Sequence, residues 1–269
     1  MVQQAKKNRE RMQLPPEGFA VIPFIPKHVM NDLILFYKNN PHFVKEHGFH
    51  STMHQPNYEY RKSVLQKISA SVNHSVHELF PDHRILIANF VVKEPSIDSD
   101  VGLHSDWNYV DEAHHRSINI WCPLVDTNPL NGRLMVCPAT QFLSTDFRGT
   151  PFVPFNKQEE ARFKKKSVGL NMKKGDAAIY DSALLHFSEP NITSLSRLAI
   201  AIVLIPKDAQ PIHCFTHNGK TFVYDVDHEF FLTHQLGEIP CGYIVSREVP
   251  HHPPTEVSDA GSSSDKPSF

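Results

Sequence analysis

The sequence has few cysteines and no pairing pattern among them. Only four occur in 269 residues, and Cys122, Cys137, Cys214 and Cys241 lie far apart without a Cys-x-x-Cys pair. This spacing indicates neither a zinc ribbon nor a dense disulfide framework, because both need cysteines at short intervals. We therefore expect free thiols in a reducing compartment.

The sequence also lacks a long apolar run and an excess of charge of one sign. No apolar stretch is long enough to span a bilayer, and the N-terminus, MVQQAKKNRERMQLPPEG, has no apolar core of a secretory signal, so we expect a cytoplasmic protein. The 27 Lys and Arg residues nearly balance the 29 Asp and Glu residues, for a net charge of -2. This balance favours a small molecule as partner over nucleic acid or a membrane, and it leaves the oligomeric state open.

Length and composition favour one domain with a sizeable core, since 40% of the residues are hydrophobic. Apolar residues recur at helical spacing over residues 27–40 and 58–80, which predicts two N-terminal helices packed on that core. From Arg84 onward, short β-type runs are separated by Pro, Gly, Asn and Asp. These runs are ILIANFVVK, RSINIWCPLV, RLMVCPA, KSVGLNM, DAAIYD, RLAIAIVLIP and the hairpin PIHCFTHNGKTFVYDV.

The strands do not alternate with helices, which disfavours a parallel α/β sheet. The predicted fold class is therefore mainly β with flanking helices, a cupin-like jelly-roll barrel. We expect a single domain over residues 1–250, with the barrel at about 84–225 and a C-terminal extension to 250. Residues 251–269, rich in Pro, Ser and Asp, are expected to form a disordered tail, and residues 141–166 an irregular loop or lid.

One of the 18 histidines begins a metal-ligand pattern. In His104-Ser105-Asp106 the imidazole and the carboxylate are two positions apart, so in an extended segment both leave the same face and can reach one metal ion. A His-x-Asp pair is expected about once by chance in a chain of this composition, so the pattern needs a third ligand. His186 offers one, because its imidazole interrupts the apolar run of DAAIYDSALLHFSEPN. Two histidines and one carboxylate with open positions opposite form the facial triad of non-haem Fe(II) oxygenases.

Arg197 opens RLAIAIVLIP, the most hydrophobic strand of the chain. A guanidinium at the end of a buried strand needs an anionic partner, and its planar donor fork fits a carboxylate such as the distal one of 2-oxoglutarate. Ser188 can add a hydroxyl donor to the same carboxylate. The structural alternative for Arg197 is a salt bridge to a core carboxylate such as Asp181.

With these residues in place, the sequence resembles the phytanoyl-CoA dioxygenase-like family of Fe(II)/2-oxoglutarate-dependent oxygenases. The resemblance runs from about Ile85 to Pro206 and rests on four segments in order, with Arg197 at the family's spacing. The segments are GLHSDW, SINIWCPLVD, NGRLMV and GDAAIYDSALLHFSEPN. The resemblance implies a double-stranded β-helix that binds Fe(II), with 2-oxoglutarate and dioxygen as co-substrates.

The resemblance also implies roles for individual residues. His104, Asp106 and His186 would be the iron ligands and catalytic residues, and Arg197 with Ser188 would bind the far carboxylate of 2-oxoglutarate. A further match, Trp121, implies contact with the co-substrate, and core packing is the alternative for a tryptophan in an apolar strand.

Other polar and aromatic residues receive weaker assignments. Asn89 should line the barrel, where it either contacts 2-oxoglutarate or substrate or is a satisfied core amide. One residue of the Trp107-Asn108-Tyr109 segment is expected to contact substrate, since ligands bind at the mouths of β-barrels. His213 and His217 fall on the predicted hairpin, too far apart to chelate readily, so we interpret them as structural.

The predicted reaction is hydroxylation of an unactivated C–H bond of a small molecule, with release of succinate and CO2. Desaturation and ring formation are compatible with the same ligands, because they depend on how the substrate is placed. Two other classes share the barrel: a divalent-metal cupin acting as isomerase or hydrolase, and a non-catalytic ligand-binding barrel. The substrate, free or tethered to a carrier, stays open.

Overall fold

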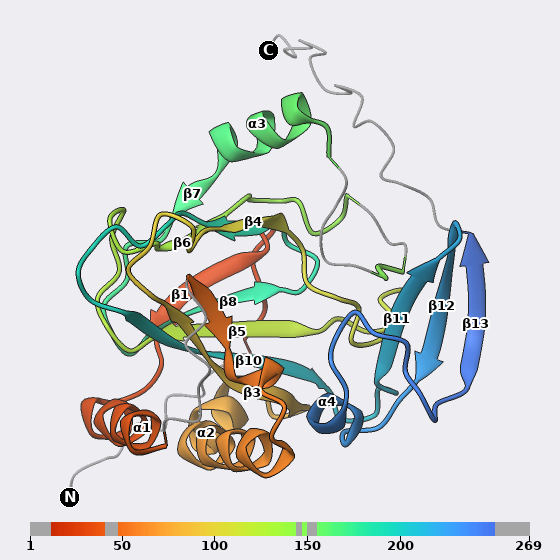
Figure 1. Ribbon diagram of the computed structural model, residues 1–269, viewed down its shortest axis with the longest axis horizontal. Coiled ribbons are helices and arrows are strands. Elements are labelled where there is room, and N and C mark those ends of the chain that lie inside the picture. Colours follow the sequence, from red (N-terminus) through yellow and green to blue (C-terminus); the bar gives the residue numbers. More distant parts are fainter. Residues whose placement is uncertain (1–11, 41–47, 144–146, 150–154, 251–269) are drawn as a thin grey trace, which may run out of the picture.

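The computed structural model describes residues 12–40, 48–143, 147–149 and 155–250. The tail expected over residues 251–269 lies outside these ranges. Two antiparallel sheets form the body of the molecule, two helices cover the outer face of the larger sheet, and a third, smaller sheet stands beside them (Figure 1).

The two N-terminal helices form where the apolar periodicity predicts them. Helix α1 spans Lys27–Asn39, and helix α2 spans Tyr58–Leu79. The Asn57 side chain caps α2 by accepting a hydrogen bond from the Tyr60 amide at 2.9 Å. Buried residues of α2 recur at steps of three or four, so one stripe of the helix faces the sheet. Within the described part of the chain, no helix combines the length and the apolar character that a membrane crossing needs.

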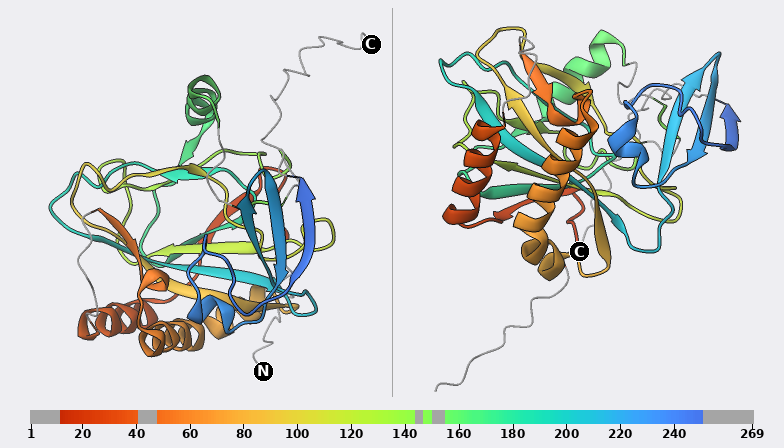
Figure 2. Two further views of the ribbon diagram at one scale, coloured as in Figure 1. Left: turned by 45° about the vertical axis from the view of Figure 1, so that its right-hand side comes forward. Right: turned by 60° about the horizontal axis from the view of Figure 1, so that its bottom comes forward.

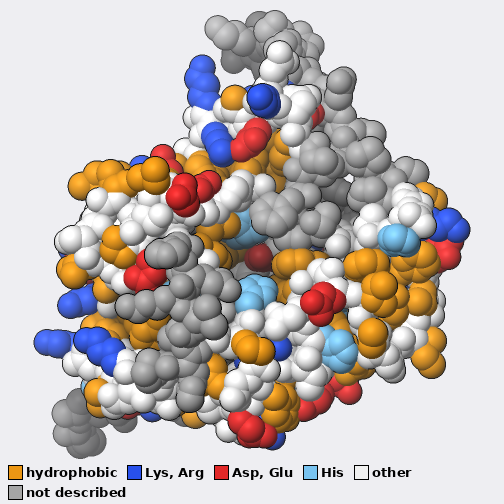
Figure 3. Space-filling model, viewed as in Figure 1, with side chains coloured by type: hydrophobic (Ala, Val, Ile, Leu, Met, Phe, Trp, Pro, Cys, Tyr) orange, Lys and Arg blue, Asp and Glu red, His pale blue; other side chains and the backbone are white. Residues whose placement is uncertain are grey.

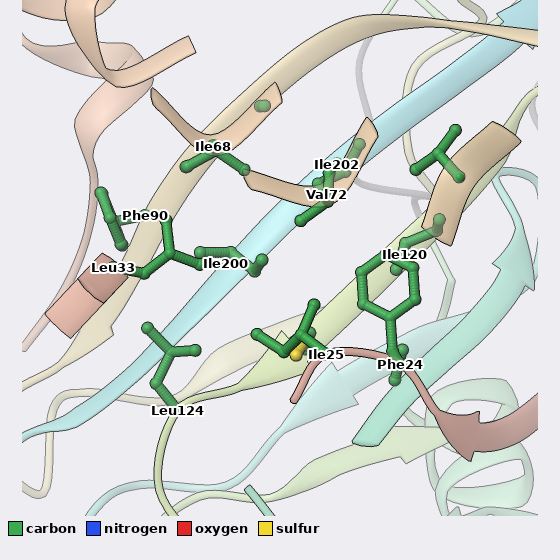
Figure 4. Packing of buried hydrophobic residues seen from close by; sticks show 14 of the residues in the cluster. Phe24, Ile25, Leu33, Ile68, Val72, Phe90, Ile120, Leu124, Ile200 and Ile202 are labelled. Carbon is green, nitrogen blue, oxygen red and sulfur yellow. The ribbon is translucent and has the colours of Figure 1, made fainter. Parts of the chain in front are cut away.

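The larger sheet has six strands in the order β1-β8-β5-β10-β3-β2. Their bounds are β1 Phe19–Pro23, β8 Asp176–Asp181, β5 Ile118–Pro123, β10 Arg197–Pro206, β3 His83–Lys93 and β2 Phe49–Ser51. Phe90 and Ile200 pack outward near Ile68 of α2 (Figure 4), whereas Val91 and Ala199 belong to the cluster on the inner face. Because both faces are covered, these strands are apolar almost throughout.

The smaller barrel sheet has four strands in the order β4-β9-β6-β7. Their bounds are β4 Val101–His104, β9 His186–Ser188, β6 Leu134–Val136 and β7 Val168–Gly169. Leu134 and Val136 pack with Trp121 and Tyr180 of the larger sheet, so apolar side chains from both sheets fill part of the space between them. The predicted fold class, mainly β with flanking helices in a jelly-roll arrangement, is confirmed.

The third sheet changes the expected extent of the barrel. Strands β11 (Ile212–His217) and β12 (Lys220–Asp225) form the predicted hairpin, with φ of 50° at Asn218 and 70° at Gly219. Strand β12 also pairs with β13 (Val245–Pro250), and in the described chain none of these three strands pairs with the two barrel sheets, so this sheet stands apart (Figure 2). The barrel sheets therefore end with β10, before the expected limit at about residue 225. The short helix α4 (Phe230–Thr233) lies between β12 and β13 in the sequence.

Several segments contain regular structure that the sequence pattern did not predict, β1, α4 and β13 among them. The region expected to hold only helices contributes β2 and the short 3-10 turn η1 (Thr52–His54) before α2. The segment 141–166, expected to be an irregular loop or lid, contains the helix α3 (Lys157–Lys166), and this part of the prediction is wrong. Asn156 and Glu159 form a reciprocal capping box that starts α3, and its last three lysines are exposed.

Candidate metal centre

Two predicted ligands are brought together by strand pairing. Strands β4 and β9 run antiparallel, and the register places His104 directly opposite His186. The centroids of the two imidazole rings are 4.1 Å apart. A cross-strand pair on one face is the closest approach that a sheet allows, so residues far apart in the sequence become neighbours.

The third predicted ligand lies in the loop that follows β4. The Asp106 amide donates to the Ser182 carbonyl at 2.9 Å, and the Asn119 side-chain amide donates to Asp106 Oδ2 at 2.7 Å. His186 Nε2 lies 4.0 Å from the same Oδ2. One ligand atom from each of His104, Asp106 and His186 lies within 4.8 Å of the others, so the three side chains can hold one metal ion.

Each imidazole is oriented by the backbone two residues before it. Nδ1 of His104 lies 2.8 Å from the Gly102 carbonyl, and Nδ1 of His186 lies 2.9 Å from the Leu184 carbonyl. A carbonyl can only accept, so in the neutral ring Nδ1 carries the proton and Nε2 keeps its lone pair. This is the arrangement that outer partners of metal-binding histidines usually produce.

The protonation states of the triad suit a bound cation. Burial, together with the charge of His186, lowers the pKa of His104 to about 3, so this imidazole is neutral at physiological pH. Burial raises the pKa of Asp106, while His186, Arg148 and the Asn119 hydrogen bond oppose that rise. A neutral imidazole and a carboxylate that is costly to bury are both stabilised when a metal ion binds.

The triad opens into a cavity of about 190 Å³ between the barrel sheets. The cavity is lined by all three triad residues and by the four other predicted site residues, Arg197, Ser188, Trp121 and Asn89. Figure 3 shows a hollow near the centre of one face of the molecule, with histidine and acidic side chains inside it. Among the described residues that line the cavity, only Asp106 and Arg197 carry a formal charge when the histidines are neutral.

Arg197 is a buried cation without a carboxylate partner in the described chain. Its Nη1 donates to the Gly132 carbonyl at 2.6 Å, and its guanidinium lies 5.0 Å from the centre of the Trp121 ring. The alternative of a salt bridge to Asp181 is wrong, because Asp181 accepts two hydrogen bonds from Arg116, at 2.7 and 2.8 Å. Burial lowers the pKa of Arg197 to about 9, which reflects the cost of an uncompensated charge.

A second buried cation lies beside Arg197. Lys93 is the residue opposite Arg197 on the paired strand β3, and its side chain is fully buried. Its Nζ donates to the backbone carbonyls of Ser188 at 3.1 Å and Glu189 at 2.5 Å. Burial and the charge of Arg197 lower the pKa of Lys93 to about 7. Lys93 is not among the residues that line the cavity, but its charge lies beside Arg197 and adds to the positive potential that an anion bound there can neutralise.

The residues with weaker assignments divide between cavity and core. Asn89 lines the cavity and donates to Ser51 Oγ at 2.6 Å, so it is both a cavity residue and a bonded amide. Trp107 and Tyr109 also line the cavity, whereas Asn108 accepts a hydrogen bond from the Arg148 amide at 2.5 Å. His213 is buried against the Phe230 ring at 5.0 Å, on the hairpin as predicted.

Several residues around the triad were missed by the sequence reasoning. Asn119 holds the Asp106 carboxylate, and it lies two positions before Trp121 on β5, hence on the same face. That spacing was a readable signal, since Trp121 was already expected to face the co-substrate. Tyr180 lines the cavity next to His186, with ring centroids 5.0 Å apart. It belongs to the segment GDAAIYDSALLHFSEPN, in which the sequence reasoning assigned roles only to His186 and Ser188.

Comparison with known proteins identifies a matching family and two relatives by sequence. The family model for phytanoyl-CoA dioxygenase (PhyH) matches residues 28–199. A phytanoyl-CoA dioxygenase of Arabidopsis thaliana is 23% identical over 161 residues, covering 51% of this chain and 57% of the relative. A phytanoyl-CoA dioxygenase domain-containing protein 1 homolog of Dictyostelium discoideum is 29% identical over 127 residues, covering 44% and 45%. The chain thus matches about half the length of these curated relatives.

Solved structures share the fold. The epimerase SnoN, in complex with Fe3+, alpha ketoglutarate and nogalamycin RO, has a TM-score of 0.54 at 16% identity, covering 73% of this chain and 82% of that one. The alpha ketoglutarate-dependent carbocyclase SnoK has a TM-score of 0.51 at 16% identity, with coverage of 73% and 82%. HygX from Streptomyces hygroscopicus, with nickel, 2-oxoglutarate and hygromycin B bound, has a TM-score of 0.51 at 15% identity, covering 72% and 84%. At these identities the likeness concerns the fold.

Proposed function

The chain belongs to the phytanoyl-CoA dioxygenase family, and from this premise we propose that it is an Fe(II)- and 2-oxoglutarate-dependent dioxygenase acting on a small molecule. One observation carries the proposal. A triad able to hold a metal and a buried arginine without a carboxylate partner in the described chain line the same cavity. A metal-binding hydrolase needs the triad alone, so the arginine favours a co-substrate that carries its own carboxylate.

The donor set fits Fe(II). His104 and His186 would each supply Nε2 and Asp106 one carboxylate oxygen, the combination that leaves adjacent positions open on a non-haem iron. Iron with bound 2-oxoglutarate supplies the activation of dioxygen that turns an unactivated C–H bond into an alcohol, with release of succinate and CO2. Asn119 keeps the carboxylate of Asp106 turned toward the imidazoles by its hydrogen bond to Oδ2.

The remaining predicted residues would bind 2-oxoglutarate. Arg197 would pair with the distal carboxylate through its donor fork, with the Ser188 hydroxyl as a further donor. Trp121 lies under the guanidinium and keeps it directed into the cavity. Asn89 lines the same cavity as a polar group, and it can donate to the co-substrate or substrate.

The lining of the cavity limits the substrate. Apart from the triad and Arg197, the wall is formed largely by apolar side chains such as Met53, Val203 and Leu236, and it carries no other formal charge among the described residues when His54 is neutral. The indole Nε1 of Trp107 is buried without a hydrogen-bond partner in the described chain, so it can donate to a substrate oxygen. We infer that the reacting part of the substrate is uncharged and mainly apolar, because a charge placed there would be unpaired.

We propose hydroxylation as the outcome. In this reaction the chain would place one C–H bond beside the metal and exclude water from it. The apolar wall near Trp107 and Tyr109 serves both tasks. Solved structures of this fold include the epimerase SnoN and the carbocyclase SnoK. Epimerisation, ring closure or desaturation would follow from a different placement of substrate over the same ligands.

The test of this proposal is anaerobic addition of Fe(II) and 2-oxoglutarate to the purified protein. We expect a weak visible charge-transfer band that needs both additions, because it arises only when the co-substrate chelates iron. Admitting oxygen should then produce succinate from 2-oxoglutarate. Zn(II) in place of Fe(II) is the control and should give neither signal. A folded, metal-loaded protein that shows no band and forms no succinate would favour a zinc cupin or a non-catalytic barrel instead.

The affinity for 2-oxoglutarate should depend on pH through Lys93. Its pKa is lowered to about 7 by burial and by Arg197, against the opposing charges of Asp100 and Glu189. A bound dianion raises that pKa, so binding takes up a proton, and affinity should fall as pH rises above 7, by at most about tenfold per unit. Calorimetric titration between pH 6.5 and 8.5 checks this.

The matched variant for this pH effect is Lys93→Met, which should flatten the profile because it removes the titrating group. Its metal affinity should stay unchanged, since the triad is intact. A wild type whose affinity does not vary over this range would contradict the role given to Lys93.

A further inference from the structure

A short segment outside the barrel sheets forms hydrogen bonds with the loop that carries Asp106. We call residues 105–112 the aspartate loop and residues 147–149 the anchor segment. The Arg148 side chain is only 10% exposed, and its Nε donates to the Asp106 carbonyl at 2.8 Å. Its Nη1 and Nη2 donate to the two carboxylate oxygens of Glu112, at 2.7 and 2.5 Å. The Glu112 side chain is 1% exposed, so the ion pair is buried.

The backbone of the anchor segment adds a third connection to the aspartate loop. The amide of Arg148 donates to Asn108 Oδ1 at 2.5 Å. One residue therefore contacts the beginning, the middle and the end of the loop, at positions 106, 108 and 112. Bonds this well distributed fix the course of a loop more firmly than any single contact, because the loop cannot rotate about one point.

The three-stranded sheet packs against the anchor segment. Phe147 packs with the buried cluster of that sheet, and the Arg247 guanidinium of β13 lies 4.7 Å from its ring centre. Gly149 lies so close to Thr216 of β11 that a Cβ on the glycine would meet the threonine Oγ1 at 2.0 Å. Arg247 also donates to Asp111 of the aspartate loop at 2.8 Å. The three-stranded sheet thus contacts the aspartate loop in two ways, through the anchor segment and through the direct bond between Arg247 and Asp111.

Asp106 is the one triad residue that no strand holds. His104 and His186 sit in paired strands, whereas Asp106 follows β4 and depends on bonds to its amide, its carbonyl and its carboxylate. Ser182 and Asn119 provide the first and third of these, and Arg148 provides the second. Without Arg148, the peptide that follows Asp106 would have only the loop itself to set its orientation.

We propose that Arg148 and Glu112 are positioning residues that hold Asp106 in place for the metal, with the three-stranded sheet as their support. The inference rests on the proposed function, since it assigns the triad to a metal. It gives the β11–β12–β13 sheet, which contributes no residue to the cavity lining in the described chain, a role in the reaction. Outer contacts of this kind often cost about 10- to 100-fold in metal affinity when removed.

The decisive variant removes both charges at once. Arg148→Met with Glu112→Leu removes both members of the buried pair, and Arg116, whose Nη1 lies 3.9 Å from Glu112, keeps its ion pair with Asp181. Replacing a buried pair by apolar residues is often neutral for folding. We expect the thermal midpoint of the metal-free protein to stay within a few degrees of wild type, while Fe(II) affinity falls about 10- to 100-fold. Anaerobic Fe(II) titration, followed by the band with 2-oxoglutarate, measures affinity independently of turnover. Lys173→Met with Asp126→Asn removes an exposed pair far from the loop and should leave affinity unchanged.

The outcomes are separable. A double variant that folds and binds Fe(II) as tightly as wild type overturns the inference and leaves the proposed function intact. If the double variant does not fold, Arg148→Lys is the alternative test, because it keeps the positive charge and loses the bidentate guanidinium donors. It should weaken Fe(II) binding in a folded protein, and unchanged affinity there overturns the inference as well. A wild type that binds no Fe(II) at all contradicts the proposed function, and this inference with it.

Discussion

Replacing His186 with alanine should eliminate Fe(II) binding and 2-oxoglutarate turnover while the protein stays folded. We expect His186 to be the central ligand, because its ring lies opposite His104 across the strand pair and its Nε2 lies 4.0 Å from Asp106. Its loss leaves two ligands, and the affinity for metal should fall by more than the roughly 10- to 100-fold that losing an outer contact costs. Anaerobic Fe(II) titration and succinate release measure the two effects.

A matched control separates this effect from the mere loss of a histidine. His217 is exposed on β11 and lines no part of the cavity, so His217→Ala should bind Fe(II) and consume 2-oxoglutarate as wild type does. After a chelator has removed the metal, adding Fe(II) should restore 2-oxoglutarate consumption in the wild type and in His217→Ala, but not in His186→Ala. A folded His186→Ala protein with normal Fe(II) affinity would show that the triad is not the metal site.

The three residues of the candidate triad could be found in the sequence because each leaves a local signal. His104 and Asp106 are two positions apart in an extended segment, and His186 interrupts an apolar run. Arg197 stands out because a charge begins the most apolar strand. What the local pattern could not supply is the register that sets His104 opposite His186, since pairing between distant strands depends on the whole sheet.

The supporting residues were harder to predict, because their partners are distant or belong to the backbone. Lys93 donates to two main-chain carbonyls at the end of β9, those of Ser188 and Glu189, and nothing in FVVKEP shows where those carbonyls will be. Arg148 lies in a segment with no motif, and its partners are set by how a loop folds back. Asn119 differs, since its spacing from Trp121 placed it on the inner face in advance.

The secondary-structure elements also differ in how well the sequence predicts them. Long elements with strong periodicity, such as α2 and β10, were predicted nearly to their ends. The edge strand β2 has three residues, too few for alternation to be read, and it forms because β3 offers a free edge. Helix α3 has only one buried residue, Phe163, so the apolar period was absent and only its capping box marked it.

Replacing Arg197 with methionine should weaken 2-oxoglutarate binding more than any other single change that leaves the triad intact. Removing one partner of a buried charge pair costs about 2 to 5 kcal/mol, which is roughly 30-fold to several thousand-fold in affinity. Fe(II) affinity without co-substrate should stay unchanged, because Arg197 contacts no triad residue and bonds instead to the Gly132 carbonyl. Titration of 2-oxoglutarate against the Fe(II) protein, followed by the charge-transfer band, measures the loss.

The same variant should be at least as stable as wild type, which distinguishes a binding residue from a structural one. In the described chain Arg197 is buried without a carboxylate partner, so methionine removes an uncompensated charge. Arg84 is the matched control. It lies toward the other end of the β3–β10 pair and donates to the Ala209 carbonyl at 3.3 Å, away from the cavity. Arg84→Met should bind 2-oxoglutarate normally. If Arg197→Met instead lowers the thermal midpoint and keeps normal 2-oxoglutarate affinity, the arginine serves the fold, and the co-substrate must be held elsewhere.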